Sequence, residues 1–352
     1  MPLNRPARAA LASTLLVLMS LLVLGLAAQR AHAAGPTAAV AMGDSEISGE
    51  GAGSYEGSTN GPSNYCHRSS NAWIKKISIG LSTGINLACS GAASANLTIG
   101  GPGQYGESSQ ADRLASVARS YTVKDIFVTI GANDNPDFSA TVEDCVFAYV
   151  FLEGSGSGCK AKDGPSWSSR IAAMEPKAEN AIENIKTVMA NDGYSASSYQ
   201  VILVSYADPA PKQSRYSDFL NLLYPVKLAE GCPMYNSDME WGHNTATPGL
   251  DSGERTIASA KGVRFLDMVE GFNGHEICAS GISASAQWVN GLLYEPSLED
   301  FWNEHAVQQS FHPNAKGHAE IADCVNGFVS QSWKEGTCKV GSSGNDQASP
   351  HP

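Results

Sequence analysis

Four short polar motifs of this sequence contain residue types that carry out nucleophilic catalysis. They are, in chain order, Gly43-Asp44-Ser45, Ser90-Gly91-Ala92, Gly131-Ala132-Asn133-Asp134 and Ser310-Phe311-His312-Pro313-Asn314. A serine hydroxyl becomes a strong nucleophile when a neighbouring base of near-neutral pKa takes its proton, and histidine suits that task. Each motif alone is also typical of an ordinary turn, since Gly, Asp, Asn and Ser are common turn residues. Their chemistry therefore depends on whether the fold brings them together.

Each motif has a role that its residue types suit. We interpret Ser45 as the nucleophile and His312 as its general base. The backbone N–H groups of Ser45 and Gly91 and the side-chain amide of Asn133 can donate to the negative oxygen that forms when a carbonyl carbon is attacked. Glycine matters here because it lets a backbone N–H approach a ligand closely. This set predicts acyl transfer through a covalent intermediate on the serine, which needs no cofactor and no metal.

Two other residues compete for these roles, Ser82 as the nucleophile and His318 as the base. Ser82 lies in Gly80-Leu81-Ser82-Thr83-Gly84, which matches the GxSxG motif, but that motif must follow a strand and open a helix. Here it follows a predicted helix over Ala72–Ile79 and precedes a predicted strand, so we reject Ser82. His318 lies in Gly317-His318-Ala319-Glu320, which opens a helical stretch, and we interpret it as structural.

The elements that must position these motifs are five short strands. Each is apolar or β-branched and is bounded by Gly, Asn, Asp or Ser, which is typical of buried strands; they are Thr37–Met42, Ile85–Cys89, Ile126–Ile130, Val201–Ser205 and Val263–Asp267. Helical patterns between them, clearest over Ala111–Arg119 and Met174–Asn191, predict parallel βαβ units. We therefore predict an α/β fold, a three-layer α/β/α sandwich around a central, mostly parallel five-stranded sheet.

The first three motifs directly follow the first three predicted strands. Ligands of open α/β sheets bind beyond the carboxyl ends of the strands, so the fold should gather Ser45, Gly91 and Asn133 at one edge. Two further segments, Ala140–Trp167 and Ser214–Glu254, contain cysteines and do not fit the alternation of strands and helices. We expect them to form disulfide-stapled loops over that edge.

The two ends of the chain differ in composition from its centre. Residues 1–33 combine an arginine-containing start with an apolar run over Leu11–Ala28, and Ala31-His32-Ala33 predicts cleavage of a signal peptide after Ala33. The alternative is a membrane anchor, because the apolar run approaches spanning length. We expect residues 34–338 to form the catalytic domain and residues 339–352, rich in Gly, Ser, Asn and Pro, to be a disordered tail.

Cysteine content and charge narrow the class further. Eight cysteines, an even number, in an exported chain predict disulfides, although about 105 pairings are open. The sequence has no CxxC pair and no neighbouring His at a zinc-site spacing, so we expect no metal. The net charge is −12 at pH 7, and about −15 once Arg5, Arg8 and Arg30 are removed, which argues against nucleic acid or an anionic membrane surface as a partner. We expect a monomer with no stable membrane anchor.

Taken in this order, the four motifs resemble the blocks of the SGNH (GDSL-like) hydrolases, which are GDS, a glycine, GxND and a C-terminal DxxH. The likeness covers the chain up to Cys338 and is strongest for the secreted actinobacterial esterase and lipase branch, through Cys66-His67-Arg68-Ser69, Cys89-Ser90-Gly91-Ala92, Gly274–Cys278 and Phe311–Asn314. It implies the flavodoxin-like SGNH fold and a secreted serine ester hydrolase with a small-molecule or lipid ester as substrate. It also implies sequential disulfides, namely Cys66–Cys89, Cys145–Cys159, Cys232–Cys278 and Cys324–Cys338.

One position departs from the pattern of that family. The family's acid lies three residues before the histidine, where this chain has the uncharged Gln309. Some secreted members orient the base with a backbone carbonyl two residues before it, which here belongs to Ser310, and we favour that Ser–His dyad. The side-chain oxygen of Gln309 and the carboxylate of Glu304 are the alternatives. A triad acid fixes the tautomer and orientation of the base and stabilises its protonated form, and a carbonyl can do the first two.

The identity of the ester is left open by the sequence. A carbohydrate O-deacetylase or a phospholipase A would use the same residues. A non-catalytic module that binds polysaccharide or lipid would use the same fold. The complete set of Ser45, Gly91, Asn133 and His312 favours an enzyme over such a module.

Overall fold

Seven strands form one sheet in the computed structural model, which describes residues 35–151, 158–216, 224–293 and 307–351. The strands follow the order β2-β1-β3-β4-β5-β6-β7 across the sheet, and their bounds are Thr37–Gly43 (β1), Thr83–Asn86 (β2), Thr122–Thr129 (β3), Gln200–Val204 (β4), Arg264–Asp267 (β5), Glu335–Val340 (β6) and Asp346–Pro350 (β7). Neighbouring strands from β2 to β6 are parallel, and β7 runs antiparallel to β6. The predicted signal peptide and Glu304 lie outside the described residues.

The five predicted strands are β1 to β5, with ends that differ from the prediction by a few residues. The central strand β1 is buried along nearly its whole length, and its Val40 pairs with Ile85 on one side and Ile126 on the other. Such strands read as continuous apolar runs because both faces of a parallel sheet are covered. The α/β sandwich is therefore confirmed, with two strands more than the five predicted.

The C-terminal segment is ordered, which corrects the predicted disordered tail over residues 339–352. β6 and β7 form an antiparallel hairpin in which Val340 pairs with Asp346. The turn between them closes with a 2.8 Å hydrogen bond from Gly341 N to the Asn345 carbonyl oxygen. Backbone hydrogen bonds to a neighbouring strand hold this segment, rather than an apolar pattern of side chains, so its composition did not reveal it. The domain therefore extends through β7.

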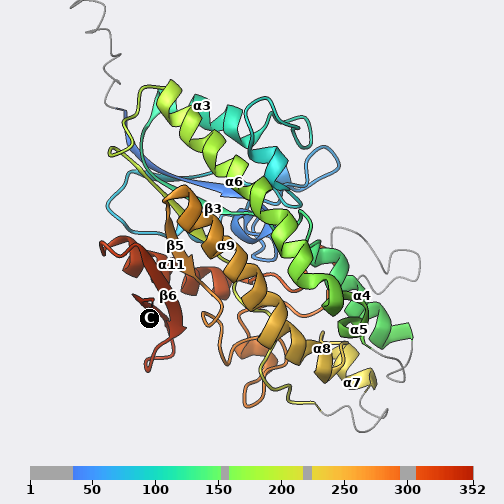
Figure 1. The fold of residues 1–352 in the computed structure, drawn as a ribbon. Helices are drawn as coiled ribbons and strands as arrows, with labels where there is room; N and C mark the ends of the chain where they lie inside the picture. The colour runs from blue at the N-terminus through green and yellow to red at the C-terminus, as the bar shows by residue number, and fades with distance from the viewer. Residues whose placement is uncertain (1–34, 152–157, 217–223, 294–306, 352) are drawn as a thin grey trace, which may run out of the picture. The chain divides into compact units, whose positions relative to one another are not determined.

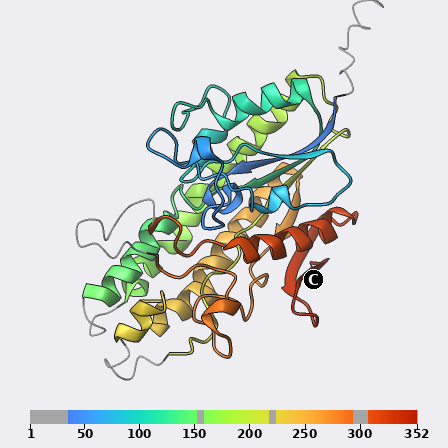
Figure 2. The same ribbon diagram turned by 180° about the vertical axis from the view of Figure 1, so that it is seen from behind.

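Helices cover both faces of the sheet, as a three-layer sandwich requires. α3 (Gln110–Ser120), α6 (Trp167–Asn191) and α9 (Thr247–Lys261) cover one face, and α11 (Ala315–Val329) covers the other (Figure 1 and Figure 2). α6 buries one apolar face, which includes Ile171, Met174, Ala178, Ile182, Ile185 and Met189. This spacing follows the helical period of 3.6 residues, which is why the sequence pattern located the helix.

The two segments that were predicted to be loops are largely helical. The first contains α4 (Phe138–Phe151) and α5 (Cys159–Asp163); the second contains α7 (Tyr224–Ala229), α8 (Asn236–Trp241) and the start of α9, which follows the π-helical turn η6 (Gly242–Ala246). α4 is apolar on most of its surface and therefore lacks a helical period, and α5, α7 and α8 are too short to show one. These helices gather at one end of the molecule (Figure 1).

Several shorter elements connect the strands. They are α2 (Ser45–Ser48), η1 (Gly57–Thr59), η2 (Trp73–Lys75), η3 (Ser94–Leu97), η4 (Gly164–Ser166) and η7 (Ala284–Ala286). The helix predicted over Ala72–Ile79 is thus only the single turn η2. Its apolar residues Trp73 and Ile74 are adjacent and buried, so they anchor one turn but do not provide the stripe that a longer helix needs.

Four disulfides link the elements. The pairs are Cys66–Cys89, Cys145–Cys159, Cys232–Cys278 and Cys324–Cys338, the four that the family resemblance implies. The second joins α4 to α5, and the fourth joins α11 to β6. Within the described ranges, no helix has the length and apolar character needed to cross a bilayer.

Candidate active site

Ser45 lies at the sharp turn between β1 and α2. Asp44 N donates to the Thr129 carbonyl oxygen (3.1 Å), and the Asp44 side chain caps α2 by accepting from Glu46 N (3.1 Å). Gly43 has a φ of 138°, and a Cβ at this position would lie 1.9 Å from the Thr129 carbonyl oxygen. Only glycine can therefore end β1 in this way. The turn places Ser45 at the carboxyl edge of the sheet, where ligands of this fold bind.

His312 meets Ser45 although the two residues are 267 positions apart. His312 Nε2 lies 2.8 Å from Ser45 Oγ, and His312 Nδ1 lies 3.0 Å from the Ser310 carbonyl oxygen. Because a carbonyl oxygen can only accept, Nδ1 carries the ring hydrogen and Nε2 is the acceptor for the serine proton. The loop is anchored on both sides, by a 2.9 Å hydrogen bond from Asn290 N to the His312 carbonyl oxygen and by Asn314, which caps α11.

Opposing influences set the pKa of His312. Burial has the largest effect and lowers the pKa of His312. The negative charge of Glu50 and the backbone carbonyls of Ser310 and Gln308 raise this pKa. The nearby His67 lowers it. The net result is a pKa below the usual value for histidine, so the imidazole is neutral at neutral pH. The neutral ring is the form that a general base needs.

Gly91 and Asn133 line the same cavity as Ser45 and His312. Gly91 follows β2 and has a φ of 75°, a conformation that favours glycine. Asn133 follows β3, and its Nδ2 donates to the Ala92 carbonyl oxygen (3.1 Å). The structure therefore brings together at one edge of the sheet the four residues that the sequence motifs singled out.

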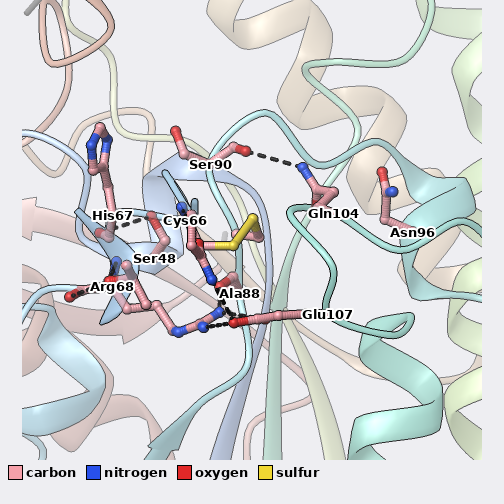
Figure 3. The surroundings of a disulfide bond; sticks show 12 residues. Ser48, Cys66, His67, Arg68, Ala88, Ser90, Asn96, Gln104 and Glu107 are labelled. Carbon is pink, nitrogen blue, oxygen red and sulfur yellow. Dashed lines mark hydrogen bonds and ion pairs between the residues drawn. A yellow bond between two sulfur atoms is a disulfide. The ribbon is translucent and has the colours of Figure 1, made fainter. Parts of the chain in front are cut away.

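Side-chain contacts hold the Ser90-Gly91 loop in place. The Cys66–Cys89 disulfide ends one residue before this loop, and Arg68, two residues after Cys66, pairs with Glu107 (Figure 3). Gln104 Nε2 donates to the carbonyl oxygen of Ser90 (3.1 Å). These contacts fix the backbone before any ligand arrives, which is what a donor to a developing negative charge requires.

A cavity of about 440 Å³ opens beside Ser45 and His312. Its polar end contains the four residues named above, and its apolar wall includes Phe138, Val142 and Val146 of α4 together with Leu250, Leu292 and Phe311. The three α4 residues are four positions apart and therefore share one face of the helix. An apolar chain attached to a carbonyl group fits this arrangement, with the carbonyl at the polar end.

Two carboxyl groups flank the nucleophile. Asp44 is fully buried and accepts a hydrogen bond from the Tyr206 hydroxyl, and burial raises the pKa of Asp44 to about 7. Glu46 lines the cavity, and burial, with a contribution from the charge of Asp44, raises the pKa of Glu46 well above its usual value. Glu46 therefore keeps its proton at neutral pH, whereas Asp44 titrates in the neutral range.

The two rival residues lie away from this chemistry. Ser82 is exposed just before β2, and its backbone N donates to the carbonyl oxygen of Thr37 (3.0 Å), at the opposite end of β1 from Ser45. His318 is fully buried on α11, where its Nδ1 accepts from Trp73 N (3.4 Å). Burial lowers the pKa of His318 to about 3, so this ring is neutral and structural.

Gln309, which occupies the position of the family's acid, contacts a tyrosine. Gln309 Oε1 lies 3.0 Å from the Tyr55 hydroxyl. The Ser310 carbonyl oxygen, by contrast, lies within hydrogen-bond distance of His312 Nδ1. Glu304, the third alternative, falls outside the described residues.

Two polar residues near the base, the buried Glu50 and the half-buried Asn290, were not predicted. Glu50 lies between Gly49 and Gly51, five positions after the nucleophile, and Asn290 Nδ2 donates to the Gly51 carbonyl oxygen (2.9 Å). An acid flanked by glycines so close to a nucleophile was a usable signal for Glu50. Asn290 stands alone in an irregular segment, where no pattern marks it.

Two groups of three potential metal ligands occur among the described residues. They are Cys145, Cys159 and Asp238, and Cys324, Cys338 and Asp346. Each group contains both cysteines of a disulfide. Disulfide sulfurs carry no thiolate charge, so neither group has the ligands that zinc prefers.

Comparisons with known proteins identify relatives over most of the chain. No family model matches the chain. Lipase 2 of Streptomyces coelicolor is 29% identical over 313 residues, which are 86% of this chain and 90% of that protein. Lipase 1 of the same organism is 30% identical over 301 residues, which are 83% of this chain and 87% of that protein. A crystal structure of phospholipase A1 from Streptomyces albidoflavus is 22% identical, covers 82% of this chain and 95% of its own, and has a TM-score of 0.49.

Proposed function

Because this chain belongs to the SGNH (GDSL-like) hydrolase family and is a serine ester hydrolase, we propose that it is an exported esterase or lipase for carboxylic esters with acyl chains longer than acetyl. The observation that carries this proposal is the 2.8 Å contact between Ser45 Oγ and His312 Nε2 at one end of an apolar cavity. A nucleophile with its base in reach is the requirement for acyl transfer.

The first half of the proposed reaction forms an acyl-enzyme. His312 Nε2 takes the proton of Ser45 Oγ as the oxygen attacks the ester carbonyl carbon. The carbonyl oxygen becomes negative and accepts hydrogen bonds from the N–H groups of Ser45 and Gly91 and from Asn133 Nδ2. The Ser310 carbonyl holds Nδ1–H and so keeps the ring oriented while it is protonated. His312 then gives its proton to the leaving alcohol, and the bond between the carbonyl carbon and the alcohol oxygen breaks.

The second half returns the enzyme to its starting state. A water molecule gives a proton to His312 Nε2 and attacks the acyl carbon. The same donors stabilise the second negative oxygen. The bond to Ser45 Oγ then breaks, Ser45 regains its proton from His312, and the free acid leaves. Every proton in this scheme passes through one nitrogen of one ring.

The apolar wall supports the preference for longer acyl chains. Phe138, Val142 and Val146 present one apolar face of α4 to the cavity. Each methylene group moved from water into such a wall contributes about 0.8 kcal/mol. Binding in the transition state should therefore improve with chain length until the cavity is full.

Export is proposed on independent grounds. Four disulfides are typical of proteins that fold in an oxidising compartment, and the sequence predicts a signal peptide over residues 1–33. N-terminal sequencing of the protein recovered from culture medium tests this. A mature chain that begins at Ala34 is expected, and retention of Met1 would contradict it.

The substrate proposal is tested with p-nitrophenyl esters of increasing acyl length, beside acetylated xylan and phosphatidylcholine. We expect kcat/KM to rise from acetate to the medium-length esters, and the Ser45→Ala variant to hydrolyse none of them. A maximum at acetate, with rapid release of acetate from xylan, would instead identify a carbohydrate O-deacetylase. Preferred release of a fatty acid from phosphatidylcholine would identify a phospholipase A.

A further inference from the structure

Glu50 immediately precedes a residue whose backbone packs against the base. Glu50 follows α2, and the next residue, Gly51, packs against the base so closely that a Cβ there would lie 3.0 Å from His312 Cβ and 2.6 Å from Asn290 Nδ2. Gly51 also has a φ of 81°. Only glycine therefore lets the chain pass at this distance, and Glu50 is fixed within one residue of this contact.

The Glu50 carboxylate is fully buried and lies within hydrogen-bond distance of three side chains. Its Oε2 lies 2.6 Å from His67 Nδ1 and accepts from Ser90 Oγ at 2.6 Å. Its Oε1 lies 3.3 Å from the Tyr55 hydroxyl. Figure 3 shows His67 and Ser90 above the Cys66–Cys89 disulfide in this view. A buried carboxylate with this many partners is held in one orientation.

The same tyrosine connects Glu50 to the position where the family has its acid. The Tyr55 hydroxyl lies 3.0 Å from Gln309 Oε1 and accepts from Gly51 N at 2.9 Å. Ser90, on the other side of Glu50, accepts from Gln308 Nε2 at 3.1 Å. The Tyr55 hydroxyl has one proton for two acceptors, Glu50 Oε1 and Gln309 Oε1. Glu50 is thus separated by a single side chain from each of the two residues that precede Ser310.

Three ionisable side chains influence His312 or are influenced by it. They are Glu50, which follows α2, His67, on the segment after η1, and His318, on α11. Among them only Glu50 is negative, and it is the main influence that raises the pKa of His312 against burial. His67 acts in the opposite direction but more weakly, although it is bonded to Glu50. Among these three side chains, Glu50 is therefore the one that favours the protonated imidazole.

We propose that Glu50 is a positioning residue that supplies the negative charge opposite the protonated form of His312, while the Ser310 carbonyl supplies the orientation. In this arrangement the two tasks of a triad acid are divided between two groups. Glu50 acts through space and through the Tyr55 and Ser90 hydroxyls, without contact with the substrate. The inference rests on the proposed function, because it concerns the base of that reaction.

The test uses substitutions that remove the charge of a side chain while they change its shape very little. Glu50→Gln keeps the size of the side chain and one acceptor oxygen, replaces the other oxygen with an amide NH2 donor, and removes the charge. Glu56→Gln is the matched control, since it removes the same charge from the same segment at a side chain that is 39% exposed and pairs with Lys75. Gln309→Asp, alone and combined with Glu50→Gln, returns a carboxylate to the family position. Each purified full-length mature variant is first checked for native circular dichroism.

The pH dependence of kcat/KM is the decisive measurement. His312 must be neutral to act, so activity falls at low pH with the pKa of this ring. Loss of the Glu50 charge lowers that pKa, and the acid limb should move about one unit to lower pH. At the plateau, kcat should fall about 10- to 100-fold with KM little changed, because the imidazolium formed in the transition state has lost its counter-charge. Glu56→Gln should show neither change, and adding Gln309→Asp to Glu50→Gln should restore most of both.

Each outcome decides the question. An acid limb that stays in place in Glu50→Gln would make Glu50 purely structural and overturn the inference. If Glu50→Gln does not fold, the single variant Gln309→Asp is used instead. A gain in kcat/KM below about 10-fold agrees with a negative charge that is already present near His312. A gain above about 100-fold contradicts the inference. Labelling with a fluorophosphonate separates the two proposals. A label on a serine other than Ser45 would overturn the proposed function together with the inference. A label on Ser45, combined with an acid limb that does not move in Glu50→Gln, would overturn the inference alone.

Discussion

The carbonyl oxygen of Ser310 lies 3.0 Å from Nδ1 of His312, two residues further along the same loop. The base and the group that orients it therefore belong to one short segment, and no second element has to be docked to align the ring. The segment itself is held by Asn290, whose Nδ2 also reaches the Gln309 carbonyl oxygen (3.3 Å).

Substitution of Gln309 should have a modest effect. Because its side chain contacts Tyr55 and the Ser310 carbonyl orients the base, Gln309→Ala should retain activity within about tenfold, whereas loss of a triad acid costs about 10⁴ in rate. Glu304→Gln should also retain most activity, and His312→Ala should lose nearly all. Initial rates on a p-nitrophenyl ester measure this. A fall of 10³ or more in Gln309→Ala would show that the glutamine orients the ring.

The nucleophile can be identified without knowing the natural ester. A fluorophosphonate should label Ser45, and Ser45→Ala should abolish both labelling and hydrolysis with the circular dichroism spectrum intact. Ser82→Ala serves as the matched control and should behave as the wild type, since Ser82 lies at the other end of β1. Full activity in Ser45→Ala would end this interpretation of the site.

A larger side chain in the apolar wall should make the cavity smaller. This change should alter the preferred acyl length without affecting the catalytic step. Val142→Trp would fill part of the 440 Å³ cavity, so hydrolysis of long esters should fall at least tenfold while hydrolysis of p-nitrophenyl acetate stays within about threefold. The ratio of kcat/KM for the two substrates is the readout. Equal losses on both would place the acyl chain elsewhere.

The C-terminal hairpin should make stability depend on pH. Asp346 at the start of β7 is buried, and burial, with the nearby charge of Glu320, raises the pKa of Asp346 to about 8. The unfolded chain releases this proton near pH 4, so between pH 4 and about 8 the folded state holds more protons. Asp346 should therefore lower the free energy of unfolding as the pH rises, by up to about 1.4 kcal/mol per unit.

Asp346→Asn is the variant that tests this. It should be more stable than the wild type at pH 8 and no different at pH 4, as measured by urea unfolding at both values. Glu240→Gln, at an exposed position of α8, controls for the change of net charge. Equal stability of Asp346→Asn and wild type at pH 8 would contradict the role given to this carboxyl group.

Loss of a disulfide at the same hairpin should also be costly. The Cys324→Ser, Cys338→Ser double variant frees β6 from α11 and should lose roughly 2–5 kcal/mol. Peptide mapping of the unreduced wild type should recover the four sequential pairs. A crossed pair or a free thiol in the folded protein would refute this connectivity.

The parts of the molecule that followed from the sequence are those with a strong local pattern. β1 to β5 are apolar runs with turn residues at both ends, and α6 carries a regular stripe. The motif residues Ser45, Gly91, Asn133 and His312 could be placed in one site because three of them follow strands whose carboxyl ends share an edge. Neither step needed knowledge of long-range contacts.

The remaining parts depend on contacts that no local pattern encodes. β7 exists because β6 offers it backbone partners, and α4 is apolar on most of its surface because it borders both the core and the cavity. Glu50 is separated from His312 by more than half the chain in sequence and meets it only in the folded protein. The glycines that flank Glu50 indicated that the chain packs closely at this point. They did not indicate which residue it packs against.

The position of the two reacting groups along the chain has a consequence for biosynthesis. A ribosome delivers Ser45 early and His312 only in the last part of translation, at some 5–20 residues per second. Until that loop emerges and docks between Asn290 and α11, the serine has no base. A nascent or truncated chain is therefore inert toward esters, and hydrolytic activity itself reports that the whole domain has been made and folded.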